Sequence, residues 1–154
     1  MKRGFVERGG WWVLGQSVLM PLVVALGPLT PGDWHWPELR FLAWALFALG
    51  ASFGIGGAWV LGRNRTVFPH PNEGSQLVRH GVYRFVRHPL YASLMWLSAG
   101  WGVVWESWPT LLTGLLLTVF LIFKSHREER WLRAHFPDYA DYARHVRRLI
   151  PWLY

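Results

Sequence analysis

The 154-residue chain contains no cysteine, which excludes disulfide bonds, thiolate nucleophiles and cysteine-ligated metal sites. Acidic residues are also scarce, since 9 Asp and Glu stand against 16 Lys and Arg and leave a net charge of +7. Charged residues make up only 16% of the chain, whereas 52% is hydrophobic and the mean hydropathy is +0.15. A nucleic-acid-binding module carries its positive charge on a mostly polar surface. The composition therefore indicates an integral membrane protein and argues against nucleic acid as a partner.

The shortage of charge is greatest in four apolar stretches, none of which contains a Lys, Arg, Asp or Glu: 11–27, 41–62, 89–105 and 108–123. A helix that crosses a hydrocarbon core of ~30 Å needs about 20 residues, and the last two stretches lie at the short end of that range. Several of the 12 Trp residues fall near the ends of the stretches, as in the aromatic belts of membrane proteins. We predict a single all-α integral membrane domain over residues 1–154, with about four transmembrane helices.

Two polar segments complete the predicted domain. The loop 63–88 contains Pro and Gly residues that interrupt any long helix, and the tail 124–154 shows a helical pattern over Lys124–His135 and again over Tyr139–Leu149. The first apolar stretch follows basic residues, as a signal peptide would. We expect it to be an uncleaved helix instead, because the sequence that ends it lacks a small-x-small cleavage site.

The basic residues predict how the helices are oriented. Segment 1–10 holds three of them, the loop 63–88 five and the tail 124–154 seven, so 15 of the 16 fall on one side of a four-helix arrangement. Basic residues accumulate on the cytoplasmic side of membrane proteins. We therefore expect both termini, the loop and the tail to be cytoplasmic, with the protein in a bacterial-type inner membrane.

A cluster of chemically capable residues stands where the third apolar stretch begins. Arg87 and His88 precede Pro89, which suits the first turn of a helix, and Tyr91 falls within that turn. Free backbone N–H groups at a helix N-terminus and an Arg favour an anionic group such as a carboxylate. Glu128 and Glu129 follow the fourth apolar stretch at the same membrane face. Together these residues predict a site for a zwitterionic cofactor that carries a carboxylate, an amine and ribose hydroxyls.

Simpler interpretations exist for each half of this cluster. Arg87 and His88 are also typical of residues that flank a membrane helix and contact lipid headgroups. Glu128 and Glu129 lie among basic residues and are equally consistent with a solvated helix that forms ion pairs at i,i+3 and i,i+4 spacing. His80 and His88, eight residues apart, are a weak pair for a metal ion, and we expect no metal site.

Two motifs favour the cofactor interpretation through a family resemblance. Residues Gly81–Tyr91 read G-x-Y-x-x-x-R-H-P-x-Y, and the downstream segment begins Glu128-Glu129-x-x-Leu132. It continues with Phe136, Tyr139, Tyr142, Arg147 and Pro151. This order resembles the signature of the isoprenylcysteine carboxyl methyltransferase and phospholipid methyltransferase superfamily, and it covers about residues 62–154. Two departures, Arg79-His80 before Gly81 and Phe136-Pro137-Asp138 where Phe-Gly is frequent, affect loop shape and remove no proposed ligand.

The resemblance implies an integral membrane enzyme that uses S-adenosylmethionine. It implies that His88, Pro89 and Tyr91, with Glu128 or Glu129, line the cofactor pocket, and that Arg87 and Tyr83 close or support it. We predict Tyr83 as a further cofactor-binding residue, and Arg87, His88 and Glu129 as the catalytic residues. The C-terminal Tyr and Arg residues would close or support this pocket.

The acceptor of the methyl group stays open at this stage. We favour an isoprenylcysteine carboxyl methyltransferase-like reaction on a lipophilic or amphiphilic acceptor, with membrane lipids as further partners. A carboxylate acceptor needs no base, whereas a phosphatidylethanolamine-type amine must lose a proton to His88 or a Glu, and a thiol must become a thiolate. The remaining alternatives are an NADPH-dependent membrane reductase, which has a related R-x-P-x-Y segment, and a non-enzymatic membrane scaffold.

Overall fold

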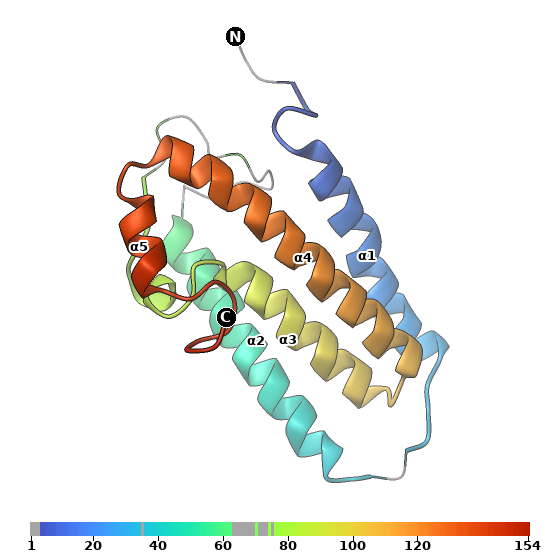
Figure 1. Ribbon diagram of the computed structural model, residues 1–154. Helices are drawn as coiled ribbons and strands as arrows, with labels where there is room; N and C mark the ends of the chain where they lie inside the picture. Colours follow the sequence, from blue (N-terminus) through green and yellow to red (C-terminus); the bar gives the residue numbers. More distant parts are fainter. Residues whose placement is uncertain (1–3, 35, 63–69, 71–73, 75) are drawn as a thin grey trace.

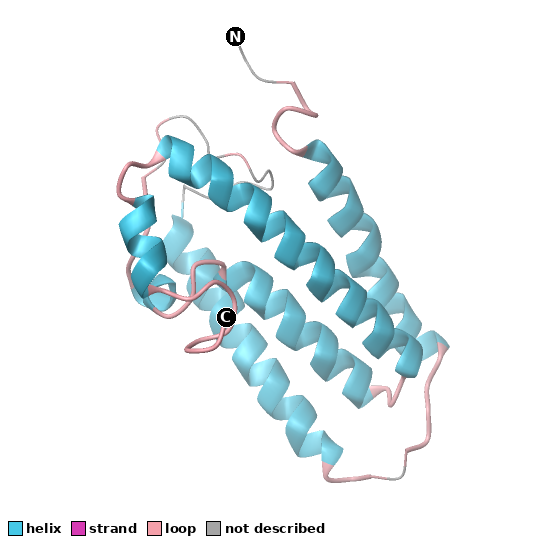
Figure 2. Ribbon diagram, in the orientation of Figure 1, coloured by secondary structure: helices cyan, strands magenta, loops and turns pink. Residues whose placement is uncertain are grey.

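The computed structural model describes residues 4–34, 36–62, 70, 74 and 76–154. Within these residues the chain is helical and contains no strand, only a single isolated bridge (Figure 2). The helices are α1 (Gly10–Leu29), α2 (Leu39–Leu61), the 3-10 helix η2 (Gly81–Arg84), α3 (Pro89–Val104), α4 (Trp108–His135) and α5 (Tyr139–His145). The prediction of an all-α membrane protein is confirmed.

Three of these helices, α1, α2 and α4, are long and apolar enough to cross a membrane. The third predicted span corresponds to α3, which is shorter than these three helices. It has 16 residues and is therefore about 24 Å long at 1.5 Å per residue. That length falls short of a hydrocarbon core of ~30 Å. The prediction of four spans is thus approximate, with three full-length helices and one short one.

Helix α4 extends beyond the predicted fourth span. Sequence patterning separated the span 108–123 from a tail helix at Lys124–His135, but α4 runs without a break for 28 residues. No Gly or Pro occurs between Gly114 and Pro137 to interrupt it. The Ser107 side chain caps its start by accepting a hydrogen bond from the Thr110 N–H. The next helix, α5, ends at His145 rather than at the predicted Leu149, because the backbone becomes extended at Val146.

Helix α3 lies at the centre of the bundle, with α2 packed along one side and α4 along the other, while α1 packs mainly on α4 (Figure 1). Small residues of α2 allow the close approach to α3. A Cβ atom on Gly54 would lie 2.5 Å from Ser93 Oγ, and one on Gly57 would lie 3.1 Å from Pro89. Packing therefore accounts for the small residues of α2.

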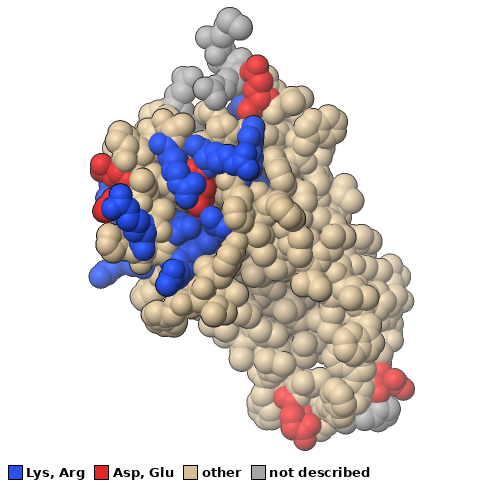
Figure 3. Space-filling model, viewed as in Figure 1, with Lys and Arg blue, Asp and Glu red and all other residues tan. Residues whose placement is uncertain are grey.

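The surface of the bundle is divided along its length. Figure 3 shows Lys and Arg side chains gathered at the end that carries α5, then a broad uncharged band, then acidic side chains at the opposite end. Large apolar side chains on the outer faces of the helices are exposed, for example Trp44 and Ile55 at 70% each and Leu112 at 63%. A belt of exposed apolar side chains between two polar ends is what contact with lipid requires.

Candidate functional site

The segment that precedes α3 is joined to the C-terminal tail. Val86 and Arg147 form the isolated parallel bridge, in which the Arg87 N–H donates to the Arg147 carbonyl over 2.8 Å and the His88 N–H to the Arg148 carbonyl over 3.0 Å. This pairing places the side chains of Arg87 and Arg148 beside the C-terminal half of α4. The tail therefore forms one wall of the site.

The Glu129 carboxylate on α4 is the centre of a buried ionic cluster. Its side chain is fully buried, and three guanidinium groups from three parts of the chain donate to it. Arg87 Nε donates to Oε1 over 2.9 Å. Arg148 donates to both oxygens, from Nε to Oε1 over 2.9 Å and from Nη2 to Oε2 over 3.0 Å. Arg133 Nη2 donates to Oε2 over 3.1 Å. A buried carboxylate is tolerated when charged partners surround it in this way.

Arg87 links this cluster to the last turn of α5. Besides its bonds to Glu129, its Nη1 donates to the carbonyl of Ala143 over 2.9 Å and to the carbonyl of Val146. Its side chain is only 9% exposed. A single guanidinium thus ties α4 to the tail through several of its five N–H donors.

His88, Tyr91 and Glu128 form a second, more accessible group next to the buried cluster. The Tyr91 hydroxyl donates to Glu128 Oε2 over 2.7 Å, and the Tyr91 and His88 rings stack with centroids 5.3 Å apart. His88 lies between the two glutamates, with Nδ1 3.6 Å from Glu128 and Nε2 3.4 Å from Glu129. The Glu128 side chain is 21% exposed, against 1% for Glu129, so Glu128 is the carboxylate that a ligand can reach.

Tyrosines of the tail pack behind the site as neutral groups. Tyr142 donates its hydroxyl to the Tyr83 carbonyl over 2.6 Å, which fixes α5 against η2. Burial raises the phenol pKa of Tyr83, Tyr139 and Tyr142 well above the usual range, and for Tyr139 and Tyr142 it outweighs the opposing effect of the Arg87 charge. These phenols therefore remain protonated donors at any physiological pH.

The structure brings together residues that the sequence placed in two separate motifs. Arg87, His88, Pro89 and Tyr91 meet Glu128 and Glu129 at one end of the bundle, while Tyr83 lies buried behind them. Their roles in binding and catalysis stay predictions. In the described part of the chain, no group of three or more His, Cys, Asp or Glu side chains is placed to hold a metal ion.

Three further cations near the site were not among the predicted site residues. Arg148 contacts Glu129, although the family resemblance pointed to its neighbour Arg147. Arg133 completes the cluster from the next turn of α4. Lys124 lies 5.2 Å from the Tyr91 ring centroid and donates to Gln16 Oε1 of α1. The i,i+4 spacing of Glu129 and Arg133 on a helix was a sequence signal for their ion pair. Successive side chains of an extended segment point to opposite sides, so Arg148 faces Glu129 and Arg147 faces away from it.

Comparison with known protein families agrees with the motifs at this site. Residues 39–139, which include both the segment Arg87–Tyr91 and the glutamate pair, match the family model described as phospholipid methyltransferase. The chain belongs to this family.

Individual relatives cover most of the chain. A methanethiol S-methyltransferase of Mycobacterium tuberculosis is 31% identical over 96% of the chain and 64% of its own length. The cobalt-zinc-cadmium resistance protein CzcN of Cupriavidus metallidurans is 29% identical over 94% of the chain and 63% of its own length. The mouse protein-S-isoprenylcysteine O-methyltransferase is 27% identical over 77% of the chain and 45% of its own length. The chain thus spans less than two thirds of the length of each.

Proposed function

We propose that this protein is an S-adenosylmethionine-dependent membrane methyltransferase that acts on a lipophilic acceptor at the cytoplasmic face of the membrane. The observation that carries the proposal is the convergence of His88, Tyr91 and Glu128 at the polar end of an apolar bundle. Membership of the phospholipid methyltransferase family supports methyl transfer over a nicotinamide-dependent reductase or a scaffold.

The side chains present fit the polar groups of S-adenosylmethionine. His88 Nε2 is buried 3.4 Å from Glu129 Oε1, a contact that meets no hydrogen-bond geometry within the described residues, and Nδ1 lies 3.6 Å from the partly exposed Glu128. Glu128 is a partly exposed carboxylate that suits an ammonium group or ribose hydroxyls. The Tyr91 ring stacks on His88 and lies 5.2 Å from the Lys124 ammonium, so it already attracts a cation, the property by which an aromatic ring attracts a sulfonium. We assign His88, Pro89, Tyr91 and Glu128 to the cofactor-binding wall.

Arg87 and Glu129 hold that wall in place. The sequence interpretation proposed both as catalytic residues, together with His88. In the structure, the Glu129 oxygens already accept bonds from three guanidinium groups, and Arg87 is shared between Glu129 and the tail. We therefore propose that Arg87 and Glu129 position His88 and the tail, and that Tyr83 supports them through its bond with Tyr142.

When bound, S-adenosylmethionine would supply a methyl group carried on a sulfonium. The residues of this chain would bind and orient the reactants and exclude water, and alignment of this kind is worth up to about 7–11 kcal/mol in favourable cases. A carboxylate acceptor, as in isoprenylcysteine, needs no base from the protein. A lipid amine does, and we propose His88 or Glu128 as the group that takes the proton. The family description makes this phospholipid amine the second candidate acceptor.

We expect purified protein in detergent to bind S-adenosylhomocysteine but not NADPH in isothermal titration calorimetry. The His88→Ala variant should bind about 10–100-fold more weakly, because a hydrogen bond to a charged group is worth about 1.5–3 kcal/mol. Arg130→Lys, an exposed substitution on α4, serves as the control and should bind like the wild type. A labelled-methyl transfer assay against lipid extracts then identifies the acceptor. Binding of NADPH, or equal affinity of wild type and His88→Ala, would contradict the proposal.

We further propose that both termini and the candidate site lie in the cytoplasm, where the cofactor is available. The support is the concentration of Lys and Arg at the end of the bundle that carries α5. A green fluorescent protein fused after Tyr154 should fluoresce in a bacterial host, whereas an alkaline phosphatase fused there should be inactive. Active phosphatase at this position would reverse the orientation.

A further inference from the structure

A polar cavity opens between η2, α5 and the C-terminal segment. It has a volume of about 270 Å³ and shares no lining residue with the candidate cofactor site. Its polar wall is formed by Arg84 of η2, Arg144 of α5 and Arg147 of the bridged segment, and its rim includes the aromatic side chains of Phe85 and Trp152. His145 and Pro151 complete the lining. Among the described residues, no acidic side chain lines the cavity.

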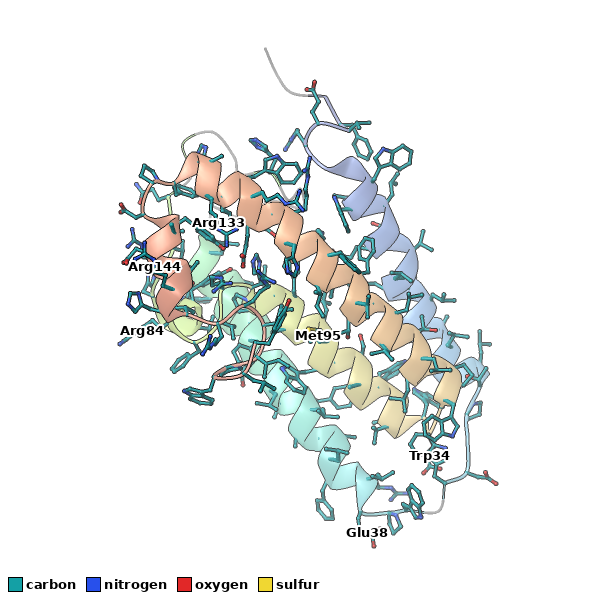
Figure 4. All side chains as sticks on the ribbon, in the orientation of Figure 1. Trp34, Glu38, Arg84, Met95, Arg133 and Arg144 are labelled. Carbon is teal, nitrogen blue, oxygen red and sulfur yellow. The ribbon has the colours of Figure 1, made fainter. Side chains whose placement is uncertain are left out.

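The three arginines of this cavity differ from those around Glu129. Arg84, Arg144 and Arg147 are exposed, and within the described residues no hydrogen bond or ion pair engages their guanidinium groups. Arg87, Arg133 and Arg148 are by contrast all bound to Glu129. In Figure 4, Arg84 and Arg144 lie at the edge of the molecule formed by η2 and α5. A cavity with three guanidinium groups that have no acidic partner among the described residues favours an anion with several oxygen acceptors. A phosphate is such an anion, because its oxygens accept pairs of hydrogen bonds from guanidinium groups.

The position of the cavity along the bundle places it at the membrane surface. Phe85 is four residues before Pro89, the first residue of α3. Because α3 is about 24 Å long and a hydrocarbon core about 30 Å thick, the start of α3 lies close to the membrane boundary rather than far outside it. Phe85 is 55% exposed and Trp152 86% exposed. Aromatic side chains exposed in this way beside Arg residues are typical of the headgroup region.

We propose that this cavity binds the phosphate of an anionic phospholipid of the surrounding membrane. The three arginines would bind the phosphate, while Phe85 and Trp152 would enter the interfacial region beside it. Basic pockets on the cytoplasmic side of membrane proteins bind acidic headgroups in this manner. This site is separate from the proposed acceptor site and does not require methyl transfer.

The proposed lipid would also act on the candidate cofactor site through the tail. Arg147 lines the lipid cavity, and its neighbour Arg148 binds Glu129 on the opposite side of the same extended segment. A bound phosphate would hold residues 144–152 against the bundle. Anionic lipid should therefore stabilise the arrangement in which Arg148 reaches Glu129.

The test uses the full chain, purified in a neutral detergent and titrated with short-chain phosphatidylglycerol, short-chain phosphatidylcholine or inorganic phosphate. We expect phosphatidylglycerol to bind and to raise the melting temperature, and the other two to do neither. The double variant Arg144→Gln/Arg147→Gln should bind phosphatidylglycerol roughly 10–30-fold more weakly. The control Arg127→Gln/Arg130→Gln removes the same charge from the exposed face of α4 and should bind like the wild type.

Three results would overturn the proposal: equal weakening in both double variants, equal binding of phosphatidylcholine, or binding of inorganic phosphate as tight as that of the lipid. If the double variant does not fold, the single variant Arg84→Gln replaces it, because Arg84 lines the cavity but lies outside the bridged segment. It should also bind phosphatidylglycerol more weakly than the control double variant does. S-adenosylhomocysteine affinity, measured in parallel without lipid, reports on the methyltransferase proposal independently of the lipid result.

Discussion

Replacing Glu129 by Gln is expected to destabilise the protein by about 3–5 kcal/mol, the usual cost of removing one partner from a buried ionic cluster. The substitution keeps the side-chain size but leaves the guanidinium groups of Arg87 and Arg148 next to a neutral amide in a buried site. For a chain of this length the loss corresponds to a melting temperature lower by about 6–20 °C. Thermal unfolding in detergent, followed by circular dichroism, measures it.

Glu128→Gln is the matched control for this experiment, because the neighbouring carboxylate has the same chemistry in a different environment. Glu128 is partly exposed, and within the described residues its carboxylate accepts a single hydrogen bond, from the Tyr91 hydroxyl. We expect Glu128→Gln to unfold within about 2 °C of the wild type and to bind S-adenosylhomocysteine about tenfold or more weakly. If both variants unfold at the same temperature, the assignment of Glu129 as the structural carboxylate is wrong.

Replacing Arg87 by Lys is expected to release the tail from the bundle. Lysine keeps the charge but has a single ammonium group, which cannot serve Glu129 and the carbonyls of Ala143 and Val146 at the same time. Limited trypsin digestion should cleave within residues 136–154 at least about tenfold faster than in the wild type, because cleavage follows the population of the locally open state. Methyl transfer should fall by about 100-fold, the effect of displacing aligned groups by about 1 Å.

Arg130→Lys is the control for this substitution, since Arg130 is exposed on α4 and has no part in the cluster around Glu129. Its digestion pattern and activity should match those of the wild type. Unchanged proteolysis of Arg87→Lys would show that the tail is held in place without the contacts of this guanidinium.

The sequence was sufficient for the features that depend on local pattern. Apolar stretches without charge identified the helices α1, α2 and α4, and Pro89 after His88 identified the start of α3. The pairing of Arg87-His88 with Glu128-Glu129 followed from the expectation that both motifs reach the same membrane face. Spacing alone did not distinguish the two glutamates. They differ in burial, since Glu129 is buried and Glu128 is partly exposed, and burial depends on the whole fold.

The features that sequence reasoning missed depend on contacts between distant segments. The bridge of Val86 with Arg147 is a pairing across 61 residues, and no local periodicity reports it. That bridge ends α5 at His145 and decides that Arg148, rather than Arg147, faces Glu129. The contact of Lys124 with Gln16 likewise joins residues 108 positions apart. The length of α3 was overestimated only slightly, by one residue at Trp105.

The unbroken course of α4 has a consequence for how this site can vary. Leu117 and Leu121, which lie in the apolar core, and Glu128 and Glu129, which lie at the candidate site, are carried by the same rigid helix. One residue inserted or deleted between Leu121 and Glu128 would turn the glutamates by about 100° relative to the core and shift them by about 1.5 Å along the axis. The packing of the apolar half of α4 therefore determines the direction in which the two carboxylates point from the helix axis. Length changes are tolerated here only in steps close to whole turns.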